Sequence, residues 1–168
     1  MISRPQPNEY PAYAAGYVNL VGEGPILELL KQQQQSTYNL FMGLKDKENY
    51  AYADGKWTIK ELLGHLIDTE RVFSYRAFTF SRESVELPGF DQDIYVNSST
   101  YITRSLDDLA NEFKAVREAS LYLFSSITDG QSTQKGIANG NPVSVRALAY
   151  MTAGHELHHI KIVKEKYL

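Results

Sequence analysis

The sequence contains no cysteine among its 168 residues. This absence excludes disulfide bonds, zinc sites built on thiolates and a cysteine nucleophile. Histidine, carboxylate groups and water are left as the ligands that could bind a metal ion. If the protein takes part in thiol chemistry, the thiol must therefore arrive with a substrate.

The sequence also lacks an excess of positive charge and a long apolar run. Lys and Arg number 17 against 20 Asp and Glu, which gives a formal net charge of −3. Binding to nucleic acid is not expected, because no surplus of cations is available to neutralise phosphates and release counterions. No stretch of about 18 apolar residues occurs, and none follows the N-terminus. We expect a cytoplasmic protein with neither membrane nor nucleic-acid partners.

Apolar residues recur at helical spacing in four segments of the chain. The segments begin at Pro25, at Thr58 with the capping box Thr58–Glu61, at Ser105 and at Ser144. No convincing strand pattern occurs elsewhere in the sequence. A chain of 168 residues fits one domain with a core that can fold unaided. These features predict a single all-α domain, residues 1–168, built as a helical bundle.

Three segments lie outside the predicted helices. Residues 1–24 contain or adjoin four of the six prolines, so we expect an extended arm that wraps over the surface. The stretch 83–104 contains Leu87-Pro88-Gly89-Phe90-Asp91 and is too long for a tight turn, so it could cover a site. Residues 128–142 are polar and rich in glycine, which is typical of a loop.

Three of the four histidines fall within the five residues 155–159. His155 and His159 form the H-E-x-x-H pattern used by zinc hydrolases. Residues four apart on an α-helix lie one above the other, roughly 6 Å apart, so two imidazoles can share one divalent ion. Both would face the core, where a metal or hydrogen-bonding partners must offset their desolvation. Two hydrogen-bonded core histidines without a metal are the alternative.

His65 is the fourth histidine and lies at the edge of the apolar face of the second predicted helix. Together with His155 and His159 it would complete a three-ligand site that leaves a coordination position for water or substrate. His158 points to one side of this pair on a helix. We interpret it as a neighbour of the ligands or as a surface residue.

Three charged residues are further candidates for the site. Glu156 is the general base in the zinc-protease pattern, but such enzymes take a third ligand downstream, and only nine residues follow His159. Glu156 is therefore either a catalytic base or a solvated helix residue. Asp68 could accept a hydrogen bond from a ligand, and Arg76 could anchor an anion. Ordinary surface charge on a helix is the alternative for both.

Two segments of the sequence resemble the DinB-like superfamily of metal proteins, also called the YfiT-like family. They are residues 56–66, KWTIKELLGHL, and residues 154–160, GHELHHI. The likeness extends to the tyrosine-rich arm, to residues 68–76 and 87–90, and to the last four residues. It implies an up-down-down-up four-helix bundle, often a homodimer, with a divalent metal on a histidine triad. That triad maps onto His65, His155 and His159.

The resemblance includes thiol S-transferases that use bacillithiol and isomerases that use mycothiol, while many members have no assigned reaction. Our first hypothesis is a metal-dependent S-transferase in detoxification or stress response. The ion would bind a low-molecular-weight thiol as thiolate and present it to an electrophile. The second hypothesis is a hydrolase in which the metal activates water and Glu156 is the base. The third is a non-enzymatic stress or metal-binding protein with a structural ion.

The identity of the metal is not fixed by imidazole ligands. Zinc and nickel are the first expectations, and iron, manganese and copper are alternatives. All three hypotheses predict that metal binding weakens as pH falls through about 6.5, because the histidine ligands must be neutral.

Overall fold

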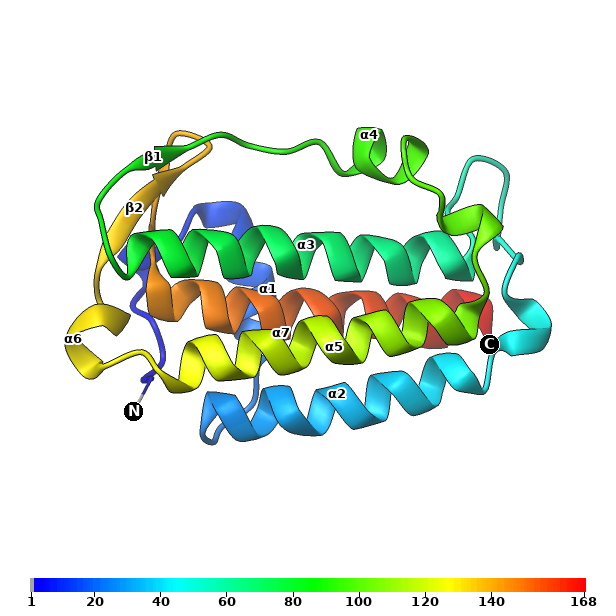
Figure 1. The fold of residues 1–168 in the computed structure, drawn as a ribbon, viewed down its shortest axis with the longest axis horizontal. Helices are drawn as coiled ribbons and strands as arrows, with labels where there is room; N and C mark the ends of the chain where they lie inside the picture. The colour runs from blue at the N-terminus through cyan, green and yellow to red at the C-terminus, as the bar shows by residue number, and fades with distance from the viewer. Residues whose placement is uncertain (1) are drawn as a thin grey trace.

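The computed structural model describes residues 2–168, and four long helices dominate it (Figure 1). They are α2 (Ile26–Met42), α3 (Ile59–Phe80), α5 (Leu106–Ser125) and α7 (Val145–Ile162), and a π-helical turn, Val163–Tyr167, continues α7. Helices α2 and α7 run in one direction and α3 and α5 in the other. The expected four-helix bundle of the up-down-down-up type is therefore confirmed. None of the helices within residues 2–168 is long and apolar enough to cross a membrane.

The predicted helix starts agree with side-chain caps in the structure. Thr58 and Glu61 form the expected capping box, in which each side chain accepts the backbone N–H of the other residue. Ser105 and Ser144 cap α5 and α7 by accepting a backbone N–H from the first turn. Each cap satisfies a donor that the helix itself cannot pair, and thereby fixes where the helix begins.

The bundle interior contains two apolar clusters with polar side chains between them. Along α7 and the π-helical turn that continues it, the buried residues of one cluster end at Ala153, and those of the other begin at Val163. Between them His155, Glu156 and His159 are buried despite their polarity. Buried polar groups need partners, so this part of α7 is where a specific site is expected.

The connection from α3 to α5 runs back along the bundle above α3 (Figure 1). It contains β1 (Glu86–Leu87), α4 (Gln92–Asn97) and the 3-10 turn Tyr101–Thr103. A short turn between two consecutive helices makes them antiparallel. The long crossover between α3 and α5 instead lets these two helices run parallel.

The structure contains a small sheet that the sequence did not predict. β1 pairs in parallel with β2 (Lys135–Ala138), and β2 pairs antiparallel with β3 (Asn141–Ser144), after the short helix α6 (Asp129–Ser132). The strands are joined by Asn139 and Gly140, whose φ angles are 51° and 73°. Asn-Gly with positive φ at both positions is the favoured two-residue hairpin turn. The expectation of a plain loop over 128–142 was therefore wrong. The Asn139-Gly140 pair in this segment is a hairpin signal that the prediction did not use.

The N-terminal arm packs against the bundle but is not extended as expected. It contains the 3-10 turns Pro7–Glu9 and Ala12–Ala14 and the helix α1 (Ala15–Leu20). Helix α1 lies so close to α7 that a Cβ atom on Gly154 would be 2.0 Å from the carbonyl oxygen of Tyr17. The prolines thus set turns between short helical pieces instead of an extended chain.

Candidate metal centre

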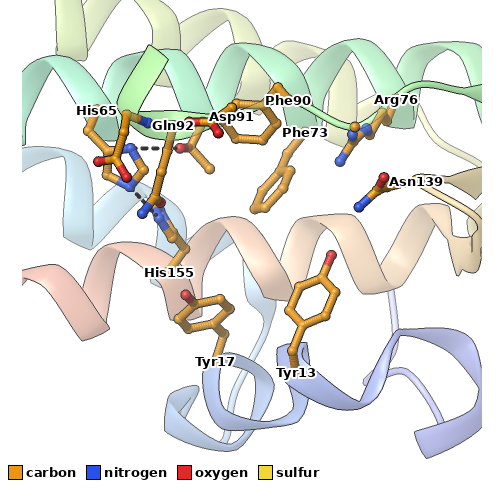
Figure 2. A pocket seen from close by; sticks show the side chains of 13 residues that line it. Tyr13, Tyr17, His65, Phe73, Arg76, Phe90, Asp91, Gln92, Asn139 and His155 are labelled. Carbon is orange, nitrogen blue, oxygen red and sulfur yellow. Dashed lines mark hydrogen bonds between the residues drawn. The ribbon is translucent and has the colours of Figure 1, made fainter. Parts of the chain in front are cut away.

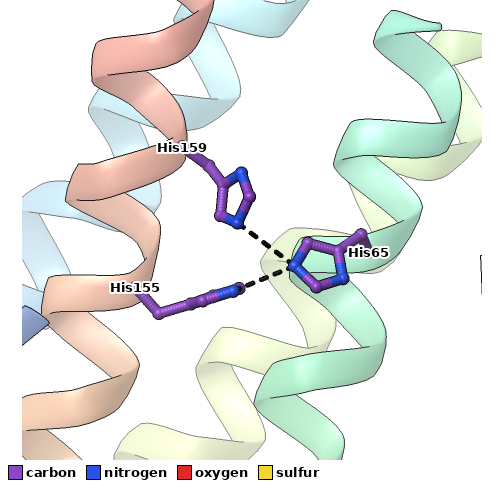
Figure 3. Close-up of side chains that lie close together, drawn as sticks. All are labelled: His65, His155 and His159. Carbon is purple, nitrogen blue, oxygen red and sulfur yellow. Dashed lines mark hydrogen bonds between the residues drawn. The ribbon is translucent and has the colours of Figure 1, made fainter. Parts of the chain in front are cut away.

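Three histidines converge between α3 and α7 (Figure 3). The Nε2 atom of His65 lies 2.9 Å from Nε2 of His155 and 3.2 Å from Nε2 of His159. One ligand atom of each residue lies within 4.8 Å of the other two. His155 and His159 are four residues apart and therefore present both rings on the same face of α7. The structure thus brings together the three residues that the sequence proposed as metal ligands.

The spacing of these nitrogens fits a divalent cation. Bonds of about 2.0–2.1 Å to zinc place neighbouring ligand nitrogens roughly 3.0–3.4 Å apart, depending on the coordination geometry. The two Nε2 distances, 2.9 and 3.2 Å, are close to that range. A neutral imidazole carries a single N–H, so the Nε2 atom of His65 could donate to just one of its two neighbours. A shared cation would satisfy all three nitrogens at once.

Burial keeps the three rings in the neutral form that a metal needs. It lowers the pKa of His65 to about 4. Burial and the neighbouring His65 lower the pKa of His159 to about 3. Burial, together with the other rings, also holds the pKa of His155 well below 6.5. Competition from protons should therefore begin below the pH of about 6.5 expected from the sequence for unperturbed histidines.

Two cavities have histidines of the triad in their walls. One, of about 360 Å³, has His65 and His155 in its wall (Figure 2). Another, of about 370 Å³, has His159 in its wall. Gln92 and Asp93, at the start of α4, line both cavities. The stretch 83–104 therefore covers the site, as its length and composition suggested.

The sequence comparisons identify the family of the chain. The family model of the DinB superfamily matches residues 29–163, which contain both histidine segments. The chain belongs to the DinB superfamily. No curated protein matches its sequence significantly.

Two solved structures share the fold of this DinB-superfamily chain. YfiT from Bacillus subtilis is described as a probable metal-dependent hydrolase with an unusual four-helix bundle topology. It is 14% identical with a TM-score of 0.73, and the match covers 97% of this chain and 90% of YfiT. The DinB-like protein YjoA from Bacillus subtilis is 19% identical with a TM-score of 0.60, over 83% of this chain and 86% of YjoA. At these identities the likeness concerns the fold.

The neighbour of His65 differs from the one that the sequence suggested. Thr69, one helical turn along α3, places its Oγ1 atom 3.5 Å from Nδ1 of His65. Asp68 instead hydrogen-bonds to Tyr101 and lies 3.8 Å from a nitrogen of Arg71. Burial raises the pKa of the Asp68 carboxyl group despite these partners. The expected contact from Asp68 to His65 was therefore wrong, since its side chain is engaged elsewhere.

Aromatic rings surround the triad in this DinB-superfamily site. The ring of Trp57 lies 4.7 Å from that of His65, and the ring of Tyr17 lies 5.5 Å from that of His155. His158 is half-buried, and the centre of its ring lies 5.4 Å from that of Tyr17. It is not one of the three residues whose ligand atoms converge. It is a neighbour of the ligands, which is one of the two interpretations that the sequence left open. Sequence reasoning did not single out Trp57 or Tyr17, because no spacing rule links them to the histidines.

Glu156 is buried in an ion-pair network and is absent from the walls of the two large cavities. One carboxylate oxygen accepts a hydrogen bond from Thr37, and the other accepts one from Arg117 at 2.6 Å. Arg117 also donates to both oxygens of Glu70, at 2.7 and 2.8 Å. Burial raises the pKa of Glu156 even though Arg117 opposes the change. The interpretation of Glu156 as a solvated helix residue was therefore wrong.

Proposed function

We propose that this protein is a divalent-metal-dependent enzyme that activates a low-molecular-weight thiol for transfer to an electrophile. The observation that carries the proposal is the position of the triad. His65 and His155 line one cavity and His159 lines another. Structural zinc sites are closed by four protein ligands, whereas three ligands beside open space are typical of catalytic sites.

The residues of the chain would hold the cation and arrange two small molecules around it. His65, His155 and His159 supply three neutral nitrogen ligands. A divalent cation bound there would lower the pKa of a coordinated thiol or water towards neutrality. The two cavities could each admit one reactant, and Gln92 and Asp93 reach both. The thiol must come from solution because the chain has no cysteine.

Hydrolysis is the second candidate, and the similarity to YfiT favours it, since that protein is described as a probable metal-dependent hydrolase. Such a reaction needs a base to take a proton from water. Glu156 is poorly suited, because Thr37 and Arg117 occupy its carboxylate. Asp93, exposed and in the wall of both cavities, is the carboxylate better placed for that role.

One set of assays separates these candidates. The protein is loaded in turn with zinc, nickel, iron, manganese and copper, and thiol consumption by an added aryl halide is measured beside hydrolysis of an activated ester. Thiol transfer that is lost in His159→Ala but retained in His158→Ala and Asp93→Asn would support the proposal. Ester hydrolysis that Asp93→Asn abolishes, without thiol turnover, would favour the hydrolase. Absence of both reactions with metal bound would contradict an enzymatic role.

The cellular setting and assembly belong to the same proposal. We expect the enzyme to act in the cytoplasm, where low-molecular-weight thiols are kept reduced. Zinc or nickel is our first expectation for the metal, because imidazole ligands suit both. The homodimer implied by the family resemblance stays a prediction, which the molecular mass in solution would test.

A further inference from the structure

Arg76 is a buried cation in the wall of the cavity that His65 and His155 share. Its side chain lies across the cavity from these histidines (Figure 2). The residue is 5% exposed, yet within residues 2–168 no carboxylate forms an ion pair with it. One Nη atom donates to the carbonyl oxygen of Pro88 at 2.8 Å, and the guanidinium lies 5.9 Å from the centre of the Phe90 ring.

This environment leaves most of the hydrogen-bonding capacity of Arg76 unused. A guanidinium has five N–H donors in a planar fork, whereas among the described residues Arg76 donates one hydrogen bond, to Pro88. A buried charge is costly unless a counter-charge or hydrogen bonds compensate it. Burial accordingly lowers the pKa of the Arg76 guanidinium below its ordinary value. An anion in the cavity would supply the missing compensation.

Helix α3 connects Arg76 to the histidine triad along one face. His65, Thr69, Phe73 and Arg76 follow one another at spacings of four, four and three residues, and all line the cavity. Such spacings keep side chains on the same side of a helix. Eleven residues correspond to roughly 16 Å along the axis, and a helical arginine leans back towards the N-terminus. A ligand that reaches both ends would span on the order of 10 Å.

Asn139 presents a second polar group beside Arg76 in the same cavity (Figure 2). It is the only non-glycine residue with positive φ within residues 2–168, and it forms the β2–β3 turn. Gly89 makes room for it, because a Cβ atom there would be 2.6 Å from Oδ1 of Asn139. The hairpin and the crossover thus place a carboxamide, with two N–H donors, at the Arg76 end of the cavity.

We propose that Arg76 and Asn139 bind the anionic group, a carboxylate or a phosphate, of the small molecule whose other end reaches the histidine triad. The second half of this inference rests on the proposed function. Asp91 also lines the cavity, but its carboxylate caps α4 by accepting from the backbone N–H groups of Asp93 and Ile94. It lies nearer to His65 than to Arg76 in Figure 2, so it does not occupy the anion position.

The anion site formed by Arg76 and Asn139, called the anchor below, is tested first on metal-free protein. Succinate and inorganic phosphate are titrated separately, and binding is followed by the NMR signal of the Arg76 Nε–H group and by calorimetry. We expect saturable binding of at least one anion, and the better binder identifies the group. Arg76→Gln should weaken binding at least tenfold, and Asn139→Gly, which tolerates positive φ, several-fold. Arg82→Gln removes the same charge from an exposed residue just after α3, outside the cavity, and should change binding less than twofold.

Two outcomes would overturn the anchor. One is folded Arg76→Gln protein that binds both anions as tightly as the wild type. The other is an Arg82→Gln variant that loses as much affinity as Arg76→Gln, which would indicate general charge attraction. Near-UV circular dichroism verifies that each variant is folded. If Arg76→Gln does not fold, Asn139→Gly and the Arg76 signal of the wild type still decide the question.

A second experiment tests the link between the anchor and the histidine triad. Protein loaded with Co²⁺ is titrated with mercapto-carboxylates of increasing chain length, each against the mercapto-alcohol of equal length, and the thiol-to-cobalt absorption band is recorded. We expect the carboxylates of suitable length to bind at least tenfold more tightly, and Arg76→Gln to abolish the preference. A cobalt band without any carboxylate preference would refute the anchor and leave the proposed function standing. Anion binding at Arg76 without a thiol band would refute thiol activation and leave the anchor standing.

Discussion

At the scale of single residues, the three histidines differ from the fourth in where their nitrogens point. Replacing His65, His155 or His159 by Ala removes one of three convergent ligands. We expect each variant to lose more than about 100-fold in metal affinity, since loss of a mere hydrogen-bonded neighbour of a ligand costs 10–100-fold. His158→Ala should lose less than about tenfold. Competition with a chelating dye measures these affinities, and equal losses for all four variants would contradict the assignment.

Gly154 allows the arm to approach α7. A Cβ atom there would lie 2.0 Å from the backbone carbonyl oxygen of Tyr17, which cannot rotate away. We expect Gly154→Ala to lower the free energy of unfolding by about 1–3 kcal/mol, the usual cost of overpacking. Gly16→Ala is the matched control, because no atom of residues 2–168 outside its own helix lies within 4 Å of the added Cβ and α1 would gain helix propensity. Urea denaturation decides between them, and equal stability of the two variants would show that the arm shifts freely.

At the scale of helices, Arg117 joins four elements of the bundle. From α5 it donates to Glu70 on α3, to Glu156 on α7 and, at 3.0 Å, to the carbonyl oxygen of Leu30 on α2. Arg117→Met would leave two buried carboxylates without a cation. We expect a loss of about 3–5 kcal/mol in the free energy of unfolding.

Arg71→Met is the control for that substitution. Arg71 also links α3 to α5, through Glu112 at 2.5 Å, but half of its side chain is exposed. Exposed ion pairs contribute about 0–1 kcal/mol, so this variant should be nearly as stable as the wild type. If Arg117→Met is no less stable than Arg71→Met in urea, the network around Glu156 does not hold the helices together.

An ion pair between Glu9 of the N-terminal arm and Arg146 of α7, called the tie below, is sensitive to pH. Arg146 donates to both oxygens of Glu9, at 2.6 and 2.7 Å. Burial would raise the pKa of Glu9, but Arg146, the backbone N–H of Gln6 and the charge of Lys135 together outweigh it and hold the folded pKa below 4.5. The tie therefore contributes stability above pH 4.5 that is lost as pH falls through the lower, folded value.

We expect Glu9→Gln to cost about 1–3 kcal/mol in the free energy of unfolding at pH 7. The difference from the wild type should shrink steadily below pH 4.5, because the wild-type carboxylate becomes protonated. Urea denaturation of both proteins between pH 3 and 7 measures this difference. Glu118→Gln, on the exposed surface of α5, should show little difference at any pH. A stability difference between the wild type and Glu9→Gln that grows towards low pH would contradict the lowered pKa of Glu9.

The four long helices were predictable because their signals are local. The caps at Thr58, Ser105 and Ser144 and the apolar spacing lie within single segments, and each start is found where expected. The histidine triad was also accessible, since two ligands share one helical turn and His158 points to one side of them, which left His65 as the third ligand. The network of Glu156 with Arg117 was not, because these two residues are 39 positions apart in the sequence and meet only through side chains that reach into the interior of the bundle.

At the scale of the whole molecule, the site lies where two long helices face each other and the crossover covers them. Helix α3 supplies His65 and α7 supplies His155 and His159, while residues 89–93 of the crossover help to enclose the cavity. The two apolar clusters of the bundle lie on either side of the polar part of α7. The fold thus has a core of its own, apart from any contribution by a metal.

Removal of the metal should therefore weaken the fold without abolishing it. A ligand at 100 times its Kd stabilises the folded state by about 2.7 kcal/mol. For a chain of this size we expect EDTA to lower the Tm of the loaded protein by roughly 5–10 °C. The metal-free protein should still melt cooperatively from a helical state, because the apolar clusters and the Arg117 network remain. Calorimetry and circular dichroism measure both properties, and a His65→Ala, His159→Ala double variant should not respond to EDTA. Loss of the melting transition in the metal-free wild type would instead make the ion a structural element, as in small zinc domains that unfold without metal.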